Sequence, residues 1–433
     1  MAVPGTLQLT RSTLNSNQIK GFWAAWGGWC LDGMDAFIYA LVLVPALTEL
    51  LPRSGIPATP GNIGYYGSIL FALFLVGWGM SMVWGPIADR FGRVKALMLT
   101  ILCYSIFTFM CGLVTNIWQL AILRVFCGIG LGGEQPMGGT FIAEEWPEDR
   151  RRMGAGYMHT GYYFGFFLAA IANYTIGANF GWRWMFVLGG TPALLVGWIQ
   201  SGVTESAAWK AKFEDPATRP RMIDSFMALF APGYMKRTVI NSLLFMVSII
   251  GLWAGSIYVP TAITQIAMRE GYVAADAARV ASYGSMILSI GTILGCLVAP
   301  LLAEAVGRRV AMAMYYLLMM VGIAAGFGSV FYMTNALMPF FFMIFVLGLG
   351  GANFALFTLW LPEQYPTDCR GSAIGFISSV GRFVGVAMVF LVGAGIQRYG
   401  SLGVPVAITA AAFILGLLVL PAAKETRGQA LPA

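Results

Sequence analysis

A charged turn between two long apolar stretches is written twice in this chain. Residues 85–95 read GPIADRFGRVK and residues 300–309 read PLLAEAVGRR, with Gly92 matching Gly307. The two copies lie about half the length of the 433-residue chain apart. A short basic turn that joins apolar stretches and returns at the half-length predicts a duplicated bundle of membrane-spanning helices.

Two further patterns repeat in the same order. The sequence GLGG at 130–133 returns at 348–351, and EEWPEDRR at 144–151 is answered by EQYPTDCR at 363–370. The longest polar connection lies between the two sets, which makes it the natural boundary between two halves. The predicted units are an N-terminal six-helix bundle at 1–203, a linker at 204–237 and a C-terminal six-helix bundle at 238–433.

Composition supports a membrane location. The chain is 58% hydrophobic and only 10% charged, whereas a soluble domain carries about 25% charged residues. Apolar stretches long enough to cross about 30 Å of hydrocarbon recur along the whole sequence. We predict an all-α polytopic membrane protein with twelve transmembrane helices in two pseudo-symmetric bundles. The predicted helices are roughly 20–50, 63–88, 94–115, 117–142, 152–178, 183–203, 238–266, 280–303, 310–333, 338–361, 371–396 and 402–423.

The positive charges give the orientation. Most of the 26 Lys and Arg residues fall on the side of the two repeated turns, which the positive-inside rule makes cytoplasmic. Both termini are then cytoplasmic, and the first helix serves as the insertion signal because the N-terminal residues are polar. Because the Lys and Arg residues gather in the loops on one side of the membrane, the net charge of +7 does not indicate a nucleic-acid partner.

Few residue types suited to catalysis or metal binding occur. The chain has one histidine and six cysteines, with no Cys-x-x-Cys pair and no Cys/His cluster. A metal centre or a nucleophilic triad needs more than this. We therefore predict that the protein is not an enzyme and that it holds no cofactor or metal.

Several motifs resemble those of the major facilitator superfamily. Residues 85–95 resemble its signature between helices 2 and 3, and Arg124 followed by Gly128 and Gly132 resembles its helix 4 motif. Glu205-Ser206 and the segment KETRG at 424–428 resemble the ends of its sixth and twelfth helices, here without the prolines. The resemblance covers roughly 20–428. It implies the major facilitator fold and a secondary transporter that works by alternating access.

Within that superfamily, Asp32-Gly33-Met34-Asp35 resembles the "DGxD" motif of proton-coupled organic acid carriers, such as the aromatic acid and sialate symporters. Gly133-Glu134 and Gly381-Arg382 are similar to the same group. The resemblance implies proton-coupled symport of a small organic acid by a monomer in the plasma membrane, a bacterial inner membrane by our expectation. Gly-Gly-Glu is shared with sugar porters, so sugar or polyol symport stays open.

Ionisable groups inside a membrane are costly unless they are paired or hydrated, and they mark functional positions. Asp32 and Asp35 lie near one face of the first helix, where two close carboxylates do not both ionise readily. Arg124 enters the fourth helix to a similar depth, so an Asp35–Arg124 pair is a reasonable expectation. His159 is a candidate for proton relay, although a lone histidine is often simply packed.

Arg382 lies near the middle of the eleventh helix, and its guanidinium matches a carboxylate bidentately. We predict that it binds the anionic group of the substrate; pairing with carbonyls of the tenth helix is the alternative. Six polar and aromatic residues are weaker candidates for the lining of a cavity between the halves. These are Tyr39, Tyr162, Tyr163, Tyr258, Asn353 and Trp360.

The repeated turn predicts a gate. Asp89 lies at the C-terminal end of the second helix, where the helix dipole disfavours an anion. The N–H groups of a helix that starts near Gly371 would compensate it, and by pseudo-symmetry Glu304 would meet the start of the fifth helix near Gly154. Local capping by Arg90 and Arg93 is the alternative for Asp89. Gating roles are also expected for Arg93, for Arg308 and for Glu134, which we place near the cytoplasmic end of the fourth helix.

Overall fold

The computed structural model describes residues 12–213, 215, 221–256, 258–399 and 401–432. The described part is helical, with no strands. The first half contains α1 (Ser16–Arg53), α2 (Pro60–Met80), α3 (Trp84–Phe91), α4 (Arg93–Cys111), α5 (Ile117–Leu131), α6 (Glu134–Glu145), α7 (Arg151–Ala172), α8 (Ala178–Phe180), α9 (Trp182–Gly189) and α10 (Ala193–Gly202).

Two short helices, α11 (Ala207–Phe213) and α12 (Met222–Ala228), lie in the linker. The second half contains α13 (Met235–Ser256), α14 (Val259–Arg269), α15 (Ala274–Val306), α16 (Arg308–Gly328), α17 (Leu337–Gly351), α18 (Asn353–Trp360), α19 (Arg370–Tyr399), α20 (Gly403–Ile408) and α21 (Ala411–Val419). Several of these are consecutive parts of one broken segment, such as α2–α3, α5–α6 and α17–α18.

Taken with their breaks, the described helices form the twelve segments of the predicted fold. Nine of them are long and apolar enough to cross a membrane, and α1, bent by 64° at residues 44–45, makes a tenth. The remaining two are α7, rich in Gly and aromatic residues, and the segment α9–α10, interrupted around Pro192. Hydropathy scans pass over such segments because broken or small-residue helices have little continuous apolar length.

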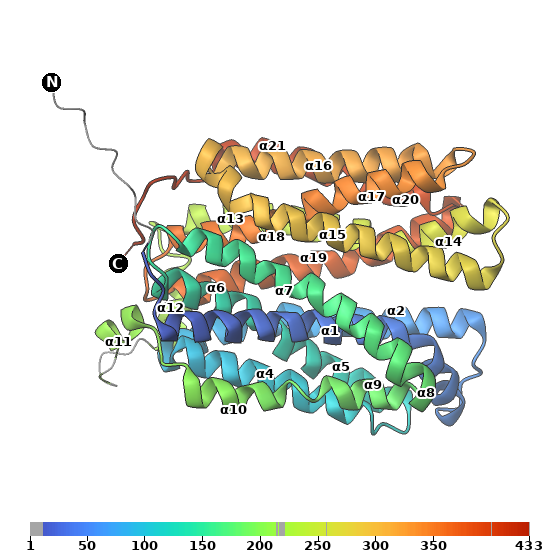
Figure 1. Cartoon of the computed structure of the whole chain (residues 1–433), viewed down its shortest axis with the longest axis horizontal. Coiled ribbons are helices and arrows are strands. Elements are labelled where there is room, and N and C mark those ends of the chain that lie inside the picture. The colour runs from blue at the N-terminus through green and yellow to red at the C-terminus, as the bar shows by residue number, and fades with distance from the viewer. Residues whose placement is uncertain (1–11, 214, 216–220, 257, 400, 433) are drawn as a thin grey trace.

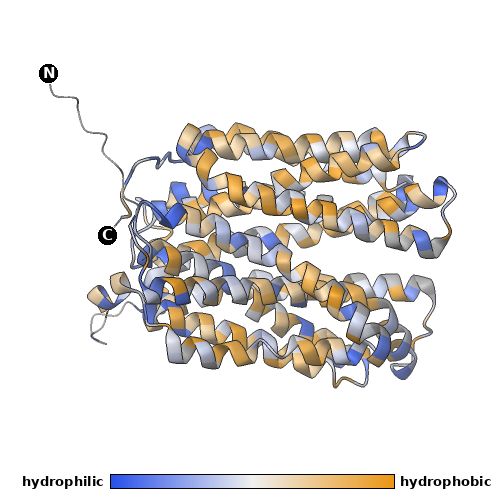
Figure 2. Cartoon of the chain, in the orientation of Figure 1, coloured by the Kyte–Doolittle hydropathy of each residue, from blue (hydrophilic) through white to orange (hydrophobic). Residues whose placement is uncertain are grey.

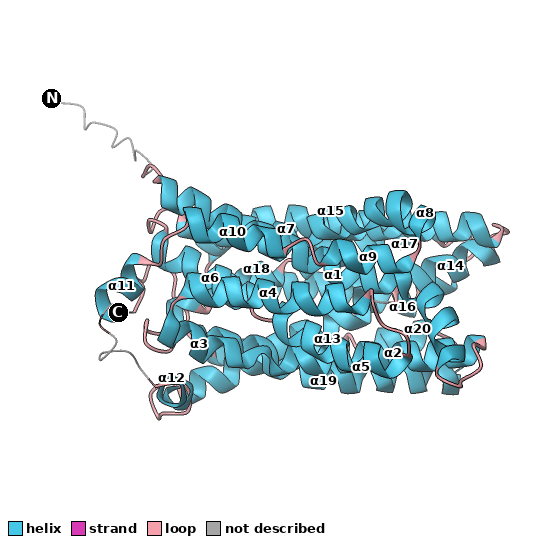
Figure 3. Cartoon of the chain, turned by 90° about the horizontal axis from the view of Figure 1, so that it is seen from below, coloured by secondary structure: helices cyan, strands magenta, loops and turns pink. Residues whose placement is uncertain are grey.

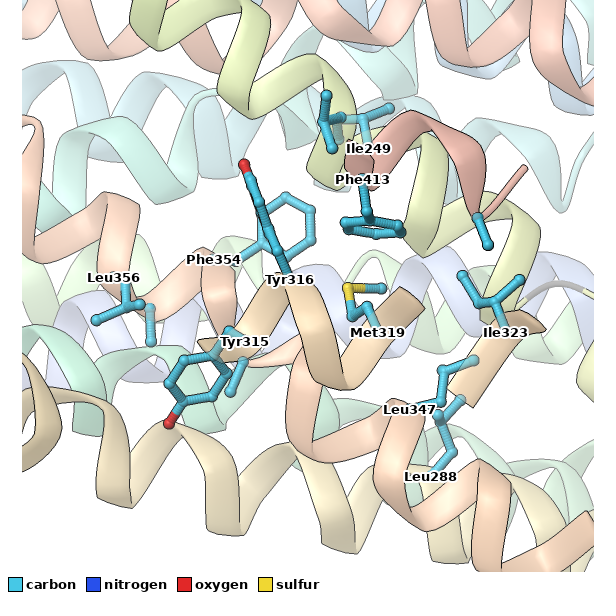
Figure 4. Packing of buried hydrophobic residues seen from close by; sticks show 14 of the residues in the cluster. Ile249, Leu288, Tyr315, Tyr316, Met319, Ile323, Leu347, Phe354, Leu356 and Phe413 are labelled. Carbon is cyan, nitrogen blue, oxygen red and sulfur yellow. The ribbon is translucent and has the colours of Figure 1, made fainter. Parts of the chain in front are cut away.

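The two halves lie side by side with their helices roughly parallel to the long axis (Figure 1). Each half has its own buried core: one core is built from residues of the first half, and the other almost wholly from the second. In the second core the Tyr316 and Phe413 rings lie 5.4 Å apart beside Met319 (Figure 4). Apolar residues cover the middle of the helices, and polar residues gather at the two ends (Figure 2).

The halves meet along two seams, where α2 and α3 pack against α19 and α7 packs against α15. Both repeated turns lie at the end of the bundle where α1 begins (Figure 1), which we call the motif end. Gly92 and Gly307 form these turns with φ of 108° and 92°, a conformation that residues with a Cβ rarely adopt. This backbone requirement explains why the Gly-Arg sequence occurs in both copies.

Candidate functional site: a closed cavity between the halves

A small cavity lies between the two halves, with a volume of about 30 Å³. Its lining comes from α1, α2, α6 and α7 on one side and from α13, α18 and α19 on the other; it includes Trp29, His159, Tyr162, Trp253, Phe354 and Arg382. A space of this size holds no more than a water or two, whereas ligand sites measure about 300–1,000 Å³. The cavity is therefore closed around a space too small for a substrate in this structure.

Arg382 brings a positive charge into this cavity from α19. Its guanidinium carbon lies 4.4 Å from the Trp78 ring centroid and 5.8 Å from that of Phe245. The side chain is buried, and Nη1 has no hydrogen-bond partner. Among the described residues Arg382 forms no ion pair and no hydrogen bond to α17 or α18, so the alternative of carbonyl pairing is not what the structure shows.

His159 and Tyr162 reach the same cavity from α7. The Trp29 ring lies 5.5 Å from His159 and 4.8 Å from Tyr162, between centroids. On the opposite side His159 stacks on Phe354 at 6.2 Å, which joins the two halves. Residues predicted for substrate binding and for proton relay thus line one space.

Arg124 does not form the expected contact with Asp35. Its guanidinium carbon lies between two aromatic rings, 4.1 Å from the centroid of Tyr39 and 4.2 Å from that of Phe74. All three of its nitrogens and both Asp35 oxygens lack hydrogen-bond partners in the described part of the chain. Arg124 still acts electrostatically on Asp35. The two rings hold the cation by cation–π attraction, and spacing along a helix does not reveal that competition.

Glu134 lies deeper than predicted. The fourth segment breaks at Gly132–Gly133 and continues as α6 to Glu145, so Glu134 stands near the middle of the segment and not near its motif end. The side chain is 1% exposed. Its Oε1 accepts a 3.4 Å hydrogen bond from the Thr100 hydroxyl, and Oε2 has no partner. The Gly-Gly pair before Glu134 was the signal for this break.

The structure does not place four other predicted lining residues in the cavity. The Tyr39 hydroxyl donates to the Gly67 carbonyl at 3.2 Å. The Tyr258 hydroxyl donates to the Val389 carbonyl at 3.5 Å, and the Asn353 amide donates to the Gly350 carbonyl at 2.9 Å. Trp360 lies towards the motif end, where its indole N–H donates to the Lys424 carbonyl at 3.0 Å.

Sequence reasoning missed most of the cavity wall. Tyr163 lines it as predicted, but Trp29, Trp78, Gln135 and Phe354 were not singled out. Gln135 directly follows Glu134, and its amide donates to the Thr358 hydroxyl of the other half at 3.4 Å. Gln135 could have been found from the sequence, because it closely follows the repeated Gly-Gly motif at which the helix breaks. The tryptophans carried none, because aromatic residues make up 14% of the chain.

The predicted contact of Asp89 with the other half is present at the motif end. Its Oδ1 accepts from the Gly371 N–H at 3.1 Å, and its Oδ2 accepts from the Ser372 N–H at 2.8 Å and hydroxyl at 2.6 Å. These groups open α19, which begins at Arg370. Arg93 also lies 3.3 Å from Asp89, so the local contact coexists with the one between the halves.

Around Asp89 a buried network ties three segments together. Arg93 binds Glu144 bidentately at 3.1 and 3.0 Å, and Arg370 of the second half binds Glu144 at 2.8 Å. The Glu205 carboxylate accepts the backbone N–H groups of Arg93 and Val94. Burial raises the pKa of Glu205, although these N–H groups oppose the shift.

The second copy repeats this network with one change. Arg308 binds Glu363 bidentately at 2.9 and 2.8 Å, and Glu425 accepts the N–H groups of Arg308 and Arg309. Glu304, however, does not cap the start of α7, because the Gly154 N–H donates to the carbonyl of Arg150, the residue just before the helix. Glu304 is instead 40% exposed and contacts the Arg152 side chain at 2.6 Å.

Comparison with known proteins identifies the family. The family model described as Major Facilitator Superfamily matches residues 25–389. The chain belongs to the Major Facilitator Superfamily. It is therefore a multi-pass membrane transporter and not an enzyme.

Two curated relatives and one solved structure illustrate the likeness. The chain is 28% identical to a probable 4-methylmuconolactone transporter of Cupriavidus pinatubonensis, over 96% of this chain and 92% of the relative. It is 26% identical to the sialic acid transporter NanX of Escherichia coli, over 94% of each. Its fold matches the proton:xylose symporter XylE with a TM-score of 0.79 and 17% identity, covering 96% of this chain and 98% of XylE. The major facilitator fold is thereby shown.

Proposed function

We propose that this superfamily member carries out proton-coupled symport of a small organic acid anion by alternating access. It acts as a monomer in a bacterial inner membrane, with the motif end and both termini in the cytoplasm. Its partners are the substrate, the proton and the lipid bilayer.

One observation carries the proposal: a buried arginine that forms no ion pair with any described residue lines the cavity between the halves. Burying a guanidinium outside an ion pair is costly; Arg382 is buried and forms no ion pair among the described residues, and Asp32 acts on it only through space. A substrate carboxylate that binds the guanidinium would supply the missing charge. The similarity to NanX supports an acidic substrate, since that relative is named as a sialic acid transporter.

The aromatic wall favours an acid with a flat or apolar body. Trp29, Trp78, Trp253 and Phe354 surround the site, and such rings offer large apolar faces for stacking. In this arrangement the arginine fixes the anionic end of the substrate and the rings fix the rest. A sugar would leave the Arg382 guanidinium without an ion pair.

Asp35 and Arg124 supply the coupling in this scheme. Asp35 is buried and interacts electrostatically with Arg124, but the two side chains form no hydrogen bond. A proton on Asp35 removes that attraction and lets the loaded carrier reorient. Neutralising Asp35 (Asp35→Asn) should abolish gradient-driven uptake and spare exchange of substrate for substrate. Retained pH-driven accumulation would refute this role.

The deciding experiment is uptake into proteoliposomes with a panel of aromatic acids, short monocarboxylates and sugars, with and without a pH gradient. We expect acids to be accumulated only with an inward proton gradient, and Arg382→Gln to lose binding of acids. The charge-preserving variant Arg382→Lys should bind them more weakly than the parent, because lysine lacks the bidentate fork. Competition by sugars or polyols, and not by acids, would support the alternative of sugar symport.

A further inference from the structure

We propose that residues 428–432 form a strap that joins the two halves, covers the route from the cavity to the motif end, and slows the opening of that end. The strap is a regulatory contact within the chain, and it does not depend on which substrate the protein carries. The segment follows α21, the last described α-helix, and runs along the motif end towards the middle of the bundle (Figure 1).

A glycine turn directs the strap. The Gln429 N–H donates to the Thr426 carbonyl at 3.0 Å, which closes a four-residue turn. Gly428 occupies the third position of this turn with φ of 72°, and a turn with a positive φ at that position favours glycine. The turn is anchored to the second half, because the Thr426 hydroxyl donates to the Glu363 carboxylate at 2.5 Å. The sequence therefore specifies where the chain leaves the second half.

Two arginines from different halves hold the strap beyond this turn. Arg151 of α7 donates to the Gln429 carbonyl at 3.4 Å, and Arg370 of α19 donates to the Pro432 carbonyl at 2.8 Å. Both arginine side chains are buried. Since α7 belongs to the first half and α19 to the second, the strap has to release one of the two arginines before the halves separate at this end.

Between the two arginine contacts, the Leu431 side chain closes a space of about 10 Å³ in the seam between the halves. Short side chains line this space from the first half, and α18 lines it from the second; the residues are Ala143, Ala155, Thr358 and Leu359. A space of this size holds one water at most. The alanines leave room on the first half that the larger leucine side chain fills, so Leu431 acts as a plug.

The plugged space lies on the route from the central cavity to the motif end. α7 contributes His159 to the cavity and Ala155 to the space, and α18 contributes Phe354 to the cavity and Thr358 to the space. In each helix the two residues are four apart, so they lie on one face and are separated by about 6 Å along the axis. In each helix the residue that lines the space is the one nearer the motif end. A molecule that leaves the cavity along these helices therefore meets Leu431 first.

The strap supports the side of the motif end where the contacts between side chains are more exposed. Asp89 grips the start of α19 on the other side of the bundle. Beside the strap, Arg152 of the first half reaches Glu304 at 2.6 Å and Glu363 at 3.5 Å, and Glu304 is 40% exposed. Exposed ion pairs contribute little to stability. A half-buried leucine and two hydrogen bonds from buried arginines add closing contacts at this place.

The test is Leu431→Ser in the full-length chain, reconstituted in lipid nanodiscs after its six native cysteines are replaced. Spin labels are placed at Lys95→Cys and Val310→Cys, two exposed positions that follow Gly92 and Gly307 by three residues in the repeated turns. Pulsed electron paramagnetic resonance then measures the distance between the halves at the motif end, and it needs no substrate.

We expect the population with long distances to rise about fivefold in Leu431→Ser, because the apolar contact of a half-buried leucine side chain is lost. Deletion of residues 429–433 should raise it further, since both arginine contacts are lost as well. The deletion also keeps the test valid if Leu431→Ser folds poorly.

Ala430→Ser is the matched control, because it places the same side chain at the exposed neighbouring position of the strap. It should keep the distances of the parent. Parent-like distances in both Leu431→Ser and the deletion would overturn the inference, as would equal opening in Ala430→Ser. If no acid is transported in the uptake panel, the proposed symport fails, whereas the distances still decide whether the strap holds the motif end closed.

Discussion

Replacing Asp89 with asparagine tests whether the contact with the start of α19 holds the motif end closed. The carboxylate accepts three hydrogen bonds, from the Gly371 N–H and from the N–H and hydroxyl of Ser372. An amide of the same shape keeps one acceptor oxygen, which can serve Ser372, and turns its NH₂ group towards the Gly371 N–H. Arg93 keeps its bidentate partner Glu144, so the loss is confined to the seam.

The size of the effect follows from the bonds lost. Hydrogen bonds to a charged group contribute about 1.5–3 kcal/mol each, so the closed state should lose about 2–3 kcal/mol relative to states with an open motif end. Since about 1.4 kcal/mol is a factor of ten, the population with this end open should rise about 30- to 150-fold. The protein should stay folded, because the two helix cores do not depend on Asp89.

A native cysteine reports the opening. Cys369 is 1% exposed, next to the start of α19, and in a variant that keeps only this cysteine its alkylation by a membrane-impermeant maleimide requires the motif end to open. We expect faster labelling of Asp89→Asn in inside-out vesicles. The pseudo-equivalent Glu304→Gln should change the rate less than about fivefold, because exposed ion pairs contribute about 1 kcal/mol or less. Equal labelling of folded Asp89→Asn and parent protein would refute the reasoning.

Three further predictions follow from the motif end. Gly92→Ala should lower the melting temperature markedly, because φ is 108° and the added Cβ would lie 2.2 Å from Glu205 Oε2. Burial raises the pKa of Glu425, but the backbone N–H groups that donate to its carboxylate outweigh burial and hold the pKa below the ordinary value of 4.5. The carboxylate therefore stabilises the fold above the unfolded-state pKa, and this stabilisation is lost as pH falls through the lower folded-state pKa. Glu425→Gln should accordingly differ from the parent in thermal unfolding at neutral pH and converge with it in acid. Removing residues 429–433 deletes the Pro432 carbonyl that Arg370 binds at 2.8 Å, and Cys369 should then be labelled faster, by a smaller factor than in Asp89→Asn.

The fold and part of the site could be predicted from the sequence, because the fold is marked by repeated motifs and the site by charged or titratable residues that are rare in apolar segments. The two turns at 85–95 and 300–309 predicted the halves, and the position of Asp89 on its helix predicted the contact with α19 that the structure contains. Arg382 and His159 were found because charged or titratable groups are scarce in apolar segments. Their meeting in one cavity needed only the assumption that both segments face the centre.

The wrong predictions concern side chains that have more than one possible partner, and the sequence does not show which partner is chosen. Arg124 was matched to Asp35 by depth, but the Tyr39 and Phe74 rings hold the guanidinium from both faces. Glu134 was placed too near the helix end because the predicted helix stops at 142, whereas α6 continues to Glu145. Trp360 was counted with the cavity only as one of several aromatic residues, whereas its N–H donates to the Lys424 carbonyl at the motif end.

Asp89 caps the start of α19 whereas Glu304 does not cap the start of α7, and this difference can be traced to one aligned pair of residues. In the first copy Gly85 faces α19 so closely that a Cβ there would lie 2.6 Å from the Gly371 carbonyl oxygen, and this approach lets the short Asp89 side chain reach backbone N–H groups. In the second copy Pro300 stands where Gly85 stands in the first, with its ring 2.4 Å from the position that a Cβ on Gly156 would take. The ring fills the space between α15 and α7, so the Arg152 side chain reaches across to Glu304 in place of a backbone cap. A helix terminus gripped by a buried carboxylate resists separation more than an exposed ion pair does, and the α3–α19 seam is therefore the stronger of the two contacts that close the motif end.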